Sequence, residues 1–216
     1  MQAVGVGGLM NAGFAEQDEV YSRAFRTKMD IARAFDRLCG EQPFSKVRVE
    51  AIAKEAGISR SSFYYHFDDR NAVVQWLSLH FYASGIDQTG RTLTWFEGHM
   101  NTTNGFRQFR TLFTSAADSN EYSAGGPFFM RHRQENLAET IVEYRHLELT
   151  DRLRFQVEAL PHAEKVMTDN FERGLYRYTL KEFCELMVSL VPKDLYEALE
   201  NPLERTSAKG DFFRST

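Results

Sequence analysis

The chain has 216 residues, of which 43% are hydrophobic and 26% are charged, and its net charge is −4. This length suits one large or two small domains with a buried core. The negative net charge excludes a generally basic nucleic-acid binder, but it does not exclude a local basic module.

The two cysteines, Cys39 and Cys184, lie far apart in the sequence and neither belongs to a CxxC pair. We therefore expect reduced, buried thiols and no disulfide framework. The first fifteen residues are uncharged and broken by glycines, which argues against a signal peptide. No run approaches the roughly 20 apolar residues of a membrane span, so we expect a cytoplasmic protein.

Residues 1–20 show no periodicity and are expected to form a disordered lead. From Tyr21 to Cys39, apolar residues recur at three- and four-residue spacing, which predicts an amphipathic helix that Gly40 and Pro43 end. Its exposed side carries Arg23, Arg26 and Lys28. Residues 21–70 hold ten lysines and arginines against seven aspartates and glutamates, so a locally basic segment precedes an acidic remainder.

The stretch from Val47 to Phe67 reads VRVEAIAKEAGISRSSFYYHF and predicts two short helices joined by a tight turn. The first helix has one apolar face, formed by Val49, Ile52, Ala53 and Ala56. Gly57 follows its last turn, where a left-handed conformation is often required. Ser59 is a suitable N-cap for the second helix.

The second helix has two different faces. Phe63 and Phe67 lie four residues apart and are expected to be buried. The other face carries arginine, serine and tyrosine: arginine reads guanine edges, serine bonds to bases or phosphates, and tyrosine reaches phosphates. This pattern predicts a helix-turn-helix that enters a DNA groove.

The segment IAKEAGISRSSFYYHF resembles the N-terminal signature of the TetR family of bacterial transcriptional regulators. The resemblance extends from about Phe25 to about Leu77. It implies an all-α protein, with an N-terminal three-helix DNA-binding domain followed by a helical domain for ligand binding and dimerisation. Family members often carry Thr at the start of the second helix, where this chain has Arg48.

Two groups of residues are candidates for contact with DNA. The base-edge candidates are Arg60, Ser61 and Tyr65. The phosphate candidates are Lys46, Arg48, Tyr64 and His66, and Ser62 belongs to the same DNA-binding set. Lys46 and Arg48 precede a helix N-terminus, which already favours anions, whereas His66 has an alternative place on the packed face of its helix.

After Phe67, Asp68 and Asp69 can cap a helix from Arg70 to about Ala83. In the resembling family this helix links the DNA-binding and effector domains, so its tilt transmits the signal. The expected segments are a disordered lead (1–20), a DNA-binding domain (21–75), an effector-binding and dimerisation domain (76–203) and a flexible tail (204–216).

The rest of the chain is predicted to be helical, without strands. We expect a short helix at Leu93–Met100 and a capping cluster at Thr102–Asn104. A loop at Ser123–Pro127 should open a helix that runs to about Leu147. There follow a helix from Thr150 to Leu160 interrupted by Pro161, a long helix from about His162 to Leu190, and a brief helix at Asp194–Leu199.

The long helix has two apolar stripes and therefore needs two partners, namely its own core and a second subunit. It is expected to contribute to a four-helix bundle in a homodimer. The expected interface residues are Met167, Phe171, Gly174, Tyr178, Phe183 and Met187.

The aromatic residues of this region either fill the core or line the small-molecule cavity that the resemblance implies. The ligand-binding candidates are Trp76, Trp95, Phe96, His99, Phe109, Phe113, Phe129 and His132. The sequence leaves the effector itself open.

The sequence contains no HExxH, GxGxxG, P-loop or GxSxG motif, so we expect no enzyme, no metal and no cofactor. It predicts a sequence-specific transcriptional regulator, a homodimeric repressor that a small molecule releases from a palindromic operator. The alternative is a DNA-binding or nucleoid-associated protein that takes no effector.

Overall fold

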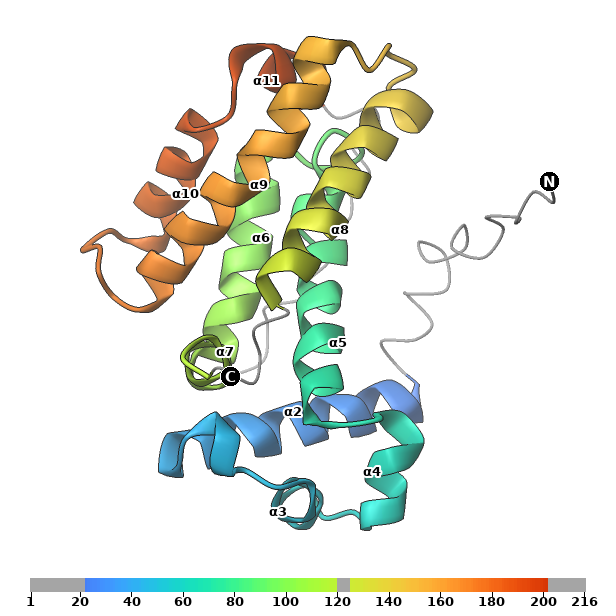
Figure 1. Cartoon of the computed structure of the whole chain (residues 1–216), viewed down its shortest axis with the longest axis vertical. Helices are drawn as coiled ribbons and strands as arrows, with labels where there is room; N and C mark the ends of the chain where they lie inside the picture. Colours follow the sequence, from blue (N-terminus) through green and yellow to red (C-terminus); the bar gives the residue numbers. More distant parts are fainter. Residues whose placement is uncertain (1–21, 120–124, 202–216) are drawn as a thin grey trace, which may run out of the picture.

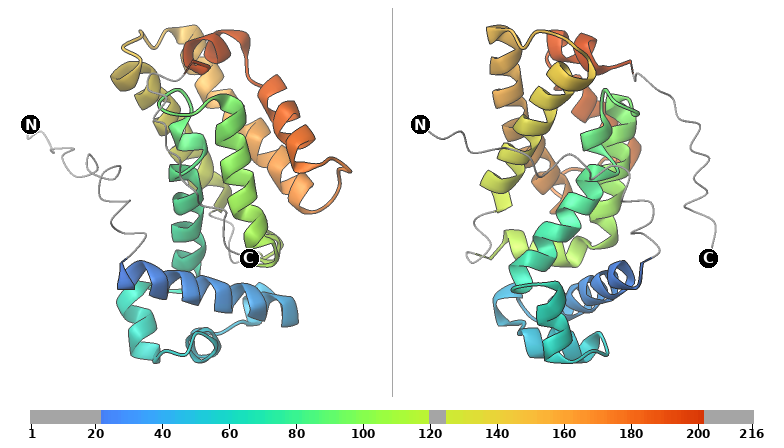
Figure 2. Two further views of the ribbon diagram at one scale, coloured as in Figure 1. Left: turned by 180° about the vertical axis from the view of Figure 1, so that it is seen from behind. Right: turned by 90° about the vertical axis from the view of Figure 1, so that its right-hand side faces the viewer.

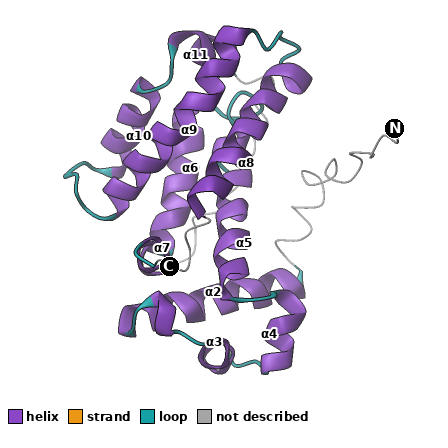
Figure 3. Cartoon of the chain, in the orientation of Figure 1, coloured by secondary structure: helices purple, strands orange, loops and turns teal. Residues whose placement is uncertain are grey.

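The computed structural model describes residues 22–119 and 125–201. Within these ranges the regular elements are helical (Figure 3), and the only bridge is an isolated one between Thr89 and Leu93. The predicted all-α class is therefore confirmed. Figure 1 shows a small group of helices at one end of the molecule and a larger bundle above it, with the helix Arg70–Ala83 (α5) running between the two groups.

The small group, called the head below, consists of α2 (Arg23–Glu41), α3 (Val49–Glu55) and α4 (Arg60–His66), with the short helix η1 (Phe44–Lys46) between α2 and α3. Both views in Figure 2 keep the head at the end of the molecule opposite α11 (Lys193–Leu199). The helix predicted from Tyr21 is present, and it continues through Gly40 to Glu41.

The helix-turn-helix has the local geometry that its sequence predicts. Gly57 adopts a φ of 69°, and the Ser59 hydroxyl accepts a hydrogen bond of 3.0 Å from the Ser62 backbone N–H. Phe63 and Phe67 are buried. Arg48 is the N-cap of α3 but makes no capping bond with its side chain, so it remains free to contact another molecule.

The helix α5 (Arg70–Ala83) has the predicted bounds, and Asp69 caps it by accepting a hydrogen bond of 2.8 Å from the Ala72 N–H. Its buried Val73, Val74 and Leu77 belong to one apolar cluster with the buried faces of α2, α3 and α4. The cluster runs through the predicted domain boundary at residue 75, which stays a prediction.

The helix α7 (Arg110–Ala117) packs against the head and forms hydrogen bonds with it. Its Leu112 N–H donates a hydrogen bond of 2.7 Å to the Asp36 carboxylate. The Ser115 hydroxyl accepts one of 2.9 Å from the Phe44 N–H. These bonds tie a helix of the upper bundle to α2 and η1.

The upper group, called the body below, packs α6 (Trp95–Gln108) against α10 (Leu180–Ser189), and α8 (Gly125–Glu139) against α9 (Asp151–Glu172). A short helix, η2 (Ile86–Gln88), follows α5, and α8 ends in a π-helical turn, η4 (Thr140–Tyr144). The helix predicted at Asp194–Leu199 is α11, which begins one residue earlier.

Two predictions about helix ends in the body are wrong. Thr102–Asn104 do not cap a new helix, because they lie inside α6; Thr94 caps α6 instead, in a capping box with Glu97. Thr102 is buried, and its hydroxyl accepts a hydrogen bond of 2.8 Å from the Ile86 N–H. Pro161 does not interrupt α9, which continues through it while Pro161 is buried.

The predicted single helix from His162 to Leu190 is also wrong. The helix α9 ends at Glu172, and Gly174 follows with a φ of 75°. The Leu175 N–H bonds to the Asn170 carbonyl and the Gly174 N–H to that of Phe171, which is a Schellman ending. A capping box between Thr179 and Glu182 then starts α10.

Residues 125–127, predicted to lie in a loop, belong to α8 instead. The helix begins at Gly125 and holds Pro127 in its first turn, while Ser123 lies outside the described residues. The predicted continuation to Leu147 is replaced by the π-helical turn that ends at Tyr144. The expected lead (1–20) and tail (204–216) also lie outside the described residues.

Replacing Gly57 with alanine should lower the free energy of unfolding by about 1–2 kcal/mol, because a left-handed conformation is strained for any residue with a Cβ. An added Cβ would meet no atom within 4 Å, so strain alone would cause the loss. Gly126→Ala in α8 is the control: it too has free space, and it should be neutral or stabilising. Urea denaturation measures the free energy of unfolding of both variants. An equal change in the two would contradict strain at Gly57 as the cause.

Candidate DNA-binding surface and effector cavity

The outer face of α4 carries the predicted base-edge candidates. Arg60, Ser61, Tyr64 and Tyr65 are exposed, and 84% of Tyr65 is accessible to solvent. The opposite face holds the buried Phe63, so the helix has a fixed inner side. An arginine, a serine and two tyrosines on one exposed helix face supply the donors and acceptors that contact bases and phosphates.

Arg60 is held in place by two neighbours. Its guanidinium lies 3.1 Å from the Glu50 carboxylate on α3 and 5.5 Å from the centre of the Tyr64 ring. The hydrogen bond with Tyr64 and the negative charge of Glu50 both raise the pKa of Arg60. The side chain is thus charged and oriented across the outer face of α4.

The predicted phosphate candidates flank this face. Lys46 and Arg48 are exposed beside the start of α3, whereas His66 is half-buried. The His66 ring lies 5.1 Å from that of Tyr65. Burial, with a smaller effect from Lys28, lowers the pKa of His66, which favours the neutral ring.

A cavity of about 380 Å³ lies in the body, between residues of α5, α6, α7, α8, α9 and α10. Aromatic and aliphatic side chains form much of its wall, while α9 contributes polar groups. Its main apolar residues are Tyr82, Ile86, Phe106, Phe113, Phe128, Phe129 and Met187, and its charged residues are Glu164, Lys165, Asp169, Glu172 and Arg173.

Of the predicted ligand-binding residues, His99, Phe113 and Phe129 line the cavity. The other five lie elsewhere because they fill apolar cores or join another network. Trp76 and Phe109 pack in the cluster of the head, Trp95 is buried among α8, α9 and α11, Phe96 packs beside Phe171 and Phe183, and His132 bonds to Asp87.

The polar wall that α9 contributes was not predicted from the sequence. Glu164, Thr168 and Glu172 recur every four residues and share one face of the helix. Polar residues at this spacing on a largely apolar face were the available signal. The wrong prediction of one long helix, with its apolar stripes, concealed it.

A buried arginine lies behind the cavity wall. Arg133 of α8 is fully buried, and its guanidinium donates hydrogen bonds of 3.1 and 3.3 Å to the two carboxylate oxygens of Glu164. It also donates a hydrogen bond of 2.8 Å to the Ile86 carbonyl and one of 3.2 Å to the side-chain oxygen of Asn136. One guanidinium therefore joins α8, α9 and η2.

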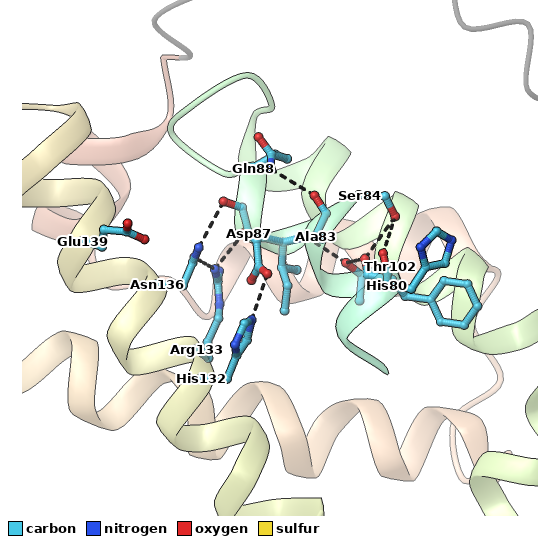
Figure 4. Close-up of polar contacts among 12 residues, drawn as sticks. His80, Ala83, Ser84, Asp87, Gln88, Thr102, His132, Arg133, Asn136 and Glu139 are labelled. Atoms are coloured by element: carbon cyan, nitrogen blue, oxygen red, sulfur yellow. Dashed lines mark hydrogen bonds and ion pairs between the residues drawn. The ribbon is translucent and has the colours of Figure 1, made fainter. Parts of the chain in front are cut away.

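Figure 4 shows how α8 holds η2. His132 and Asp87 are joined by a hydrogen bond of 2.8 Å, and the Asn136 amide donates one of 3.2 Å to the Asp87 carbonyl. Gln88 bonds in turn to the Ala83 carbonyl, at the end of α5. The position of the last turn of α5 therefore depends on the side chains of α8.

His99 of α6 faces the cavity from its buried side. Its Nε2 lies 3.6 Å from a Glu164 oxygen and has no hydrogen-bond partner among the described residues. Burial lowers the pKa of His99 to about 4; Glu164 raises it and Arg133 lowers it by smaller amounts. The imidazole is therefore neutral at pH 7.

The predicted dimer residues fall into two groups. Phe171, Phe183 and Met187 are buried inside the subunit, and the rings of Phe171 and Phe183 stack with centres 4.0 Å apart. Because the break at Gly174 folds the two stripes onto each other, these three side chains have little surface left for a partner, and their assignment to a subunit interface stays a prediction. Met167 is half-buried beside the same cluster, while Gly174 and Tyr178 are exposed in the connection between α9 and α10.

Other apolar side chains of α9 and α10 are exposed instead. They are Phe155 and Val166 on α9, Leu186 on α10, and Leu190, which is the C-cap of α10. Figure 1 shows these two helices on the same side of the body.

Within residues 22–119 and 125–201, no group of three His, Cys, Asp or Glu side chains is arranged to hold a metal ion. No helix in the described part of the chain is long and apolar enough to cross a membrane.

Comparison with known sequences identifies a family match in the head and a relative that covers about two thirds of the chain. The profile of the family described as "Bacterial regulatory proteins, tetR family" matches residues 31–76. An uncharacterized HTH-type transcriptional regulator of Haemophilus influenzae is 32% identical over 159 residues, which span 67% of this chain and 73% of that protein. The match thus extends well beyond the helix-turn-helix.

Two solved structures have a similar fold. The dihydroxyacetone kinase operon activator DhaS superposes with a TM-score of 0.61 and 18% identity, covering 81% of this chain and 98% of that one. NalD, the secondary repressor of the MexAB-OprM multidrug efflux pump in Pseudomonas aeruginosa, superposes with a TM-score of 0.52 and 14% identity. This match covers 82% of this chain and 97% of the NalD chain. At these identities the similarity concerns the fold alone.

Acidification should destabilise the protein through His99. The pKa of His99 is about 4 in the folded chain and about 6.5 in the unfolded chain, so between these values only the unfolded state binds the proton. The free energy of unfolding should fall by up to about 3 kcal/mol from pH 7 to pH 4. In His99→Gln this contribution should vanish.

Chemical denaturation of both proteins at several pH values measures the difference. Glu172, whose pKa is raised by burial, acts in the opposite direction but is present in both proteins. Parallel stability curves for wild type and variant would contradict the assignment of a neutral, buried His99.

Proposed function

Because the chain belongs to the tetR family of bacterial regulatory proteins, we propose that it acts in the cytoplasm as a homodimeric repressor, released from a palindromic operator by a small molecule. As a member of this family it is a DNA-binding transcriptional regulator and not an enzyme. The observation that carries the proposal is the outer face of α4, which presents Arg60, Ser61 and Tyr65 to solvent while Phe63 anchors the helix.

In the proposed complex, α4 lies in the major groove. Arg60, Ser61 and Tyr65 contact base edges, while Lys46, Arg48 and Tyr64 contact phosphates. Ser62 and His66, both half-buried, contribute at the edge of the same surface. The exposure of the first six side chains and the free cap position of Arg48 support this arrangement.

We place the dimer interface on the exposed apolar side chains of α9 and α10. In the dimer, α9 and α10 of one subunit would pack against α9 and α10 of a second copy and form a four-helix bundle. This contact would cover Phe155, Val166, Leu186 and Leu190 of each subunit. Two α4 helices could then meet half-sites about one DNA turn, ~34 Å, or somewhat more apart.

The cavity is the proposed effector site, and α5 is the proposed route to the head. Glu164 lines the cavity and binds Arg133, which also holds η2 at the end of α5. A ligand that binds one position of these elements more tightly would shift the spacing of the two α4 helices. An effector-free nucleoid protein is the alternative, and a cavity with polar side chains in its wall favours the sensor.

The sign of regulation is a separate point. The two solved structures are named as an activator and a repressor, so a shared fold is compatible with both. We propose repression because it is the common behaviour of the family.

Tyr65→Ala should weaken binding to the operator by about 1–3 kcal/mol if Tyr65 contacts a base. Binding to a scrambled duplex of the same length should change less. Fluorescence anisotropy measures both. Tyr144→Ala, which removes an exposed tyrosine from the body, is the control and should change neither. An equal loss on both duplexes would assign Tyr65 to the DNA backbone.

Leu186→Asp should convert the dimer into monomers, since it would bury an unpaired charge in the proposed interface. The side chain is 44% exposed in the subunit, so the fold should survive. Leu79→Asp, at an exposed position of α5, is the matched control and should stay dimeric. Sedimentation velocity measures the result; a dimeric Leu186→Asp protein would refute this interface.

A further inference from the structure

We propose that the cavity binds a compact, lipophilic molecule that carries a protonated amine, and that the carboxylate of Glu172 is the partner of that amine. This inference rests on the proposed effector site and names the chemistry of its ligand. It follows from sorting the charged groups of the cavity wall into those that have partners and those that lack them.

All four of the other charged groups in the wall have a partner of opposite charge. Glu164 receives two hydrogen bonds from Arg133, and Lys165 and Asp169 form an ion pair with each other. The fourth, Arg173, lies 2.8 Å from the Asp118 carboxylate. A ligand would have to break one of these pairs in order to use its charge.

Glu172 differs from this group because its carboxylate is incompletely satisfied. It is 8% exposed, and its Oε1 accepts no hydrogen bond from the described residues. Its Oε2 lies 3.9 Å from Arg110, whose Nε instead donates 2.8 Å to the Glu172 backbone carbonyl. Burial raises the pKa of Glu172, and the positive charges of Arg107 and Arg110 lower it by smaller amounts, so these two arginines only partly compensate the carboxylate for its lost water.

An ammonium group supplies what this site lacks. It brings N–H donors and a positive charge to a buried carboxylate that lines the cavity and has one oxygen, Oε1, without a hydrogen bond; because Oε1 itself is closed to solvent, the carboxylate must rotate to present it. A neutral ligand without a donor would leave Oε1 unpaired, which is costly in a buried site. A carboxylate ligand would lie beside Glu172 and Glu164, with the lysine and arginine of the wall already engaged.

The remaining wall suits the rest of such a molecule. Phe106, Phe113 and Phe129 present aromatic surface, which packs against apolar groups and attracts cations. His99 is neutral and therefore does not repel a positive charge. A volume of about 380 Å³ lies at the small end of ligand pockets, so the ligand must be compact.

Three probes of nearly equal shape test the charge preference: 2-naphthylmethylamine, 2-naphthylmethanol and 2-naphthoate. Calorimetric titration of the full chain at pH 7 should show that the amine binds about tenfold or more tightly than the alcohol, since both can donate to the carboxylate but only the amine adds a positive charge opposite it. The naphthoate should bind most weakly. Equal binding of amine and alcohol, tighter binding of the naphthoate, or no binding of the amine would each overturn the proposal.

Glu172→Gln should reduce the affinity for the amine about tenfold and that for the alcohol by clearly less, so the preference for the amine should largely disappear. Glu158→Gln, with the same charge change at an exposed position of α9, is the matched control and should have no effect. Thermal unfolding verifies that both variants are folded. An unchanged preference for the amine in Glu172→Gln would overturn the role of Glu172.

Adding the amine to the operator complex separates this inference from the proposed function. Glu172-dependent binding without release of DNA would support the ligand chemistry and overturn the effector role of the cavity. Release of DNA by the amine in both wild type and Glu172→Gln would support an effector-responsive regulator and overturn Glu172 as the partner.

Discussion

The full burial of the Arg133 guanidinium is the constraint on which the arrangement of the body depends. A charge without water must have its donors satisfied, and removing one member of such a pair typically costs about 3–5 kcal/mol. Arg133 meets this requirement with Glu164 from α9, the Ile86 carbonyl of η2 and Asn136 from its own helix. Helices that are distant in sequence are thereby fixed around one planar group.

This constraint also places the cavity and α5 in one connected structure. Glu164 faces the cavity on one side and Arg133 on the other, while η2 directly follows α5. At its other end, α5 is buried in the apolar cluster of the head through Val73, Val74 and Leu77. The proposed control of DNA binding needs two arrangements of these elements, and a ligand can select between them only through a difference in affinity.

The helix-turn-helix could be predicted from the sequence because several local signals agree. Gly57 satisfies a left-handed turn, Ser59 caps α4, and the spacing of Phe63 and Phe67 sets its buried face. Each signal acts within a few residues, so no knowledge of distant contacts was needed. The bounds of α5 were predictable for the same reason, since Asp69 caps its first turn.

The body was harder to predict because tertiary contacts outweigh local preference there. Thr102 resembles a cap in sequence but is buried in α6, where it bonds to η2, and Pro161 is tolerated in α9 where it is buried. Gly174 is itself a local signal for the end of a helix, but the spacing of the apolar residues on either side of it also fitted one continuous helix. Aromatic residues give no indication of whether they face a cavity or a core, and Trp76 and Phe109 face the core of the head.

The most direct test of the account is selection of bound sequences from random DNA, followed by titration of the winning sequence at several salt concentrations. A homodimer with α4 in the major groove predicts an enriched palindrome, with half-sites spaced by about one helical turn or somewhat more. Its affinity should exceed that for random DNA at every salt concentration. Binding without an enriched sequence, governed by salt alone, would contradict the specific regulator and favour a protein that coats DNA.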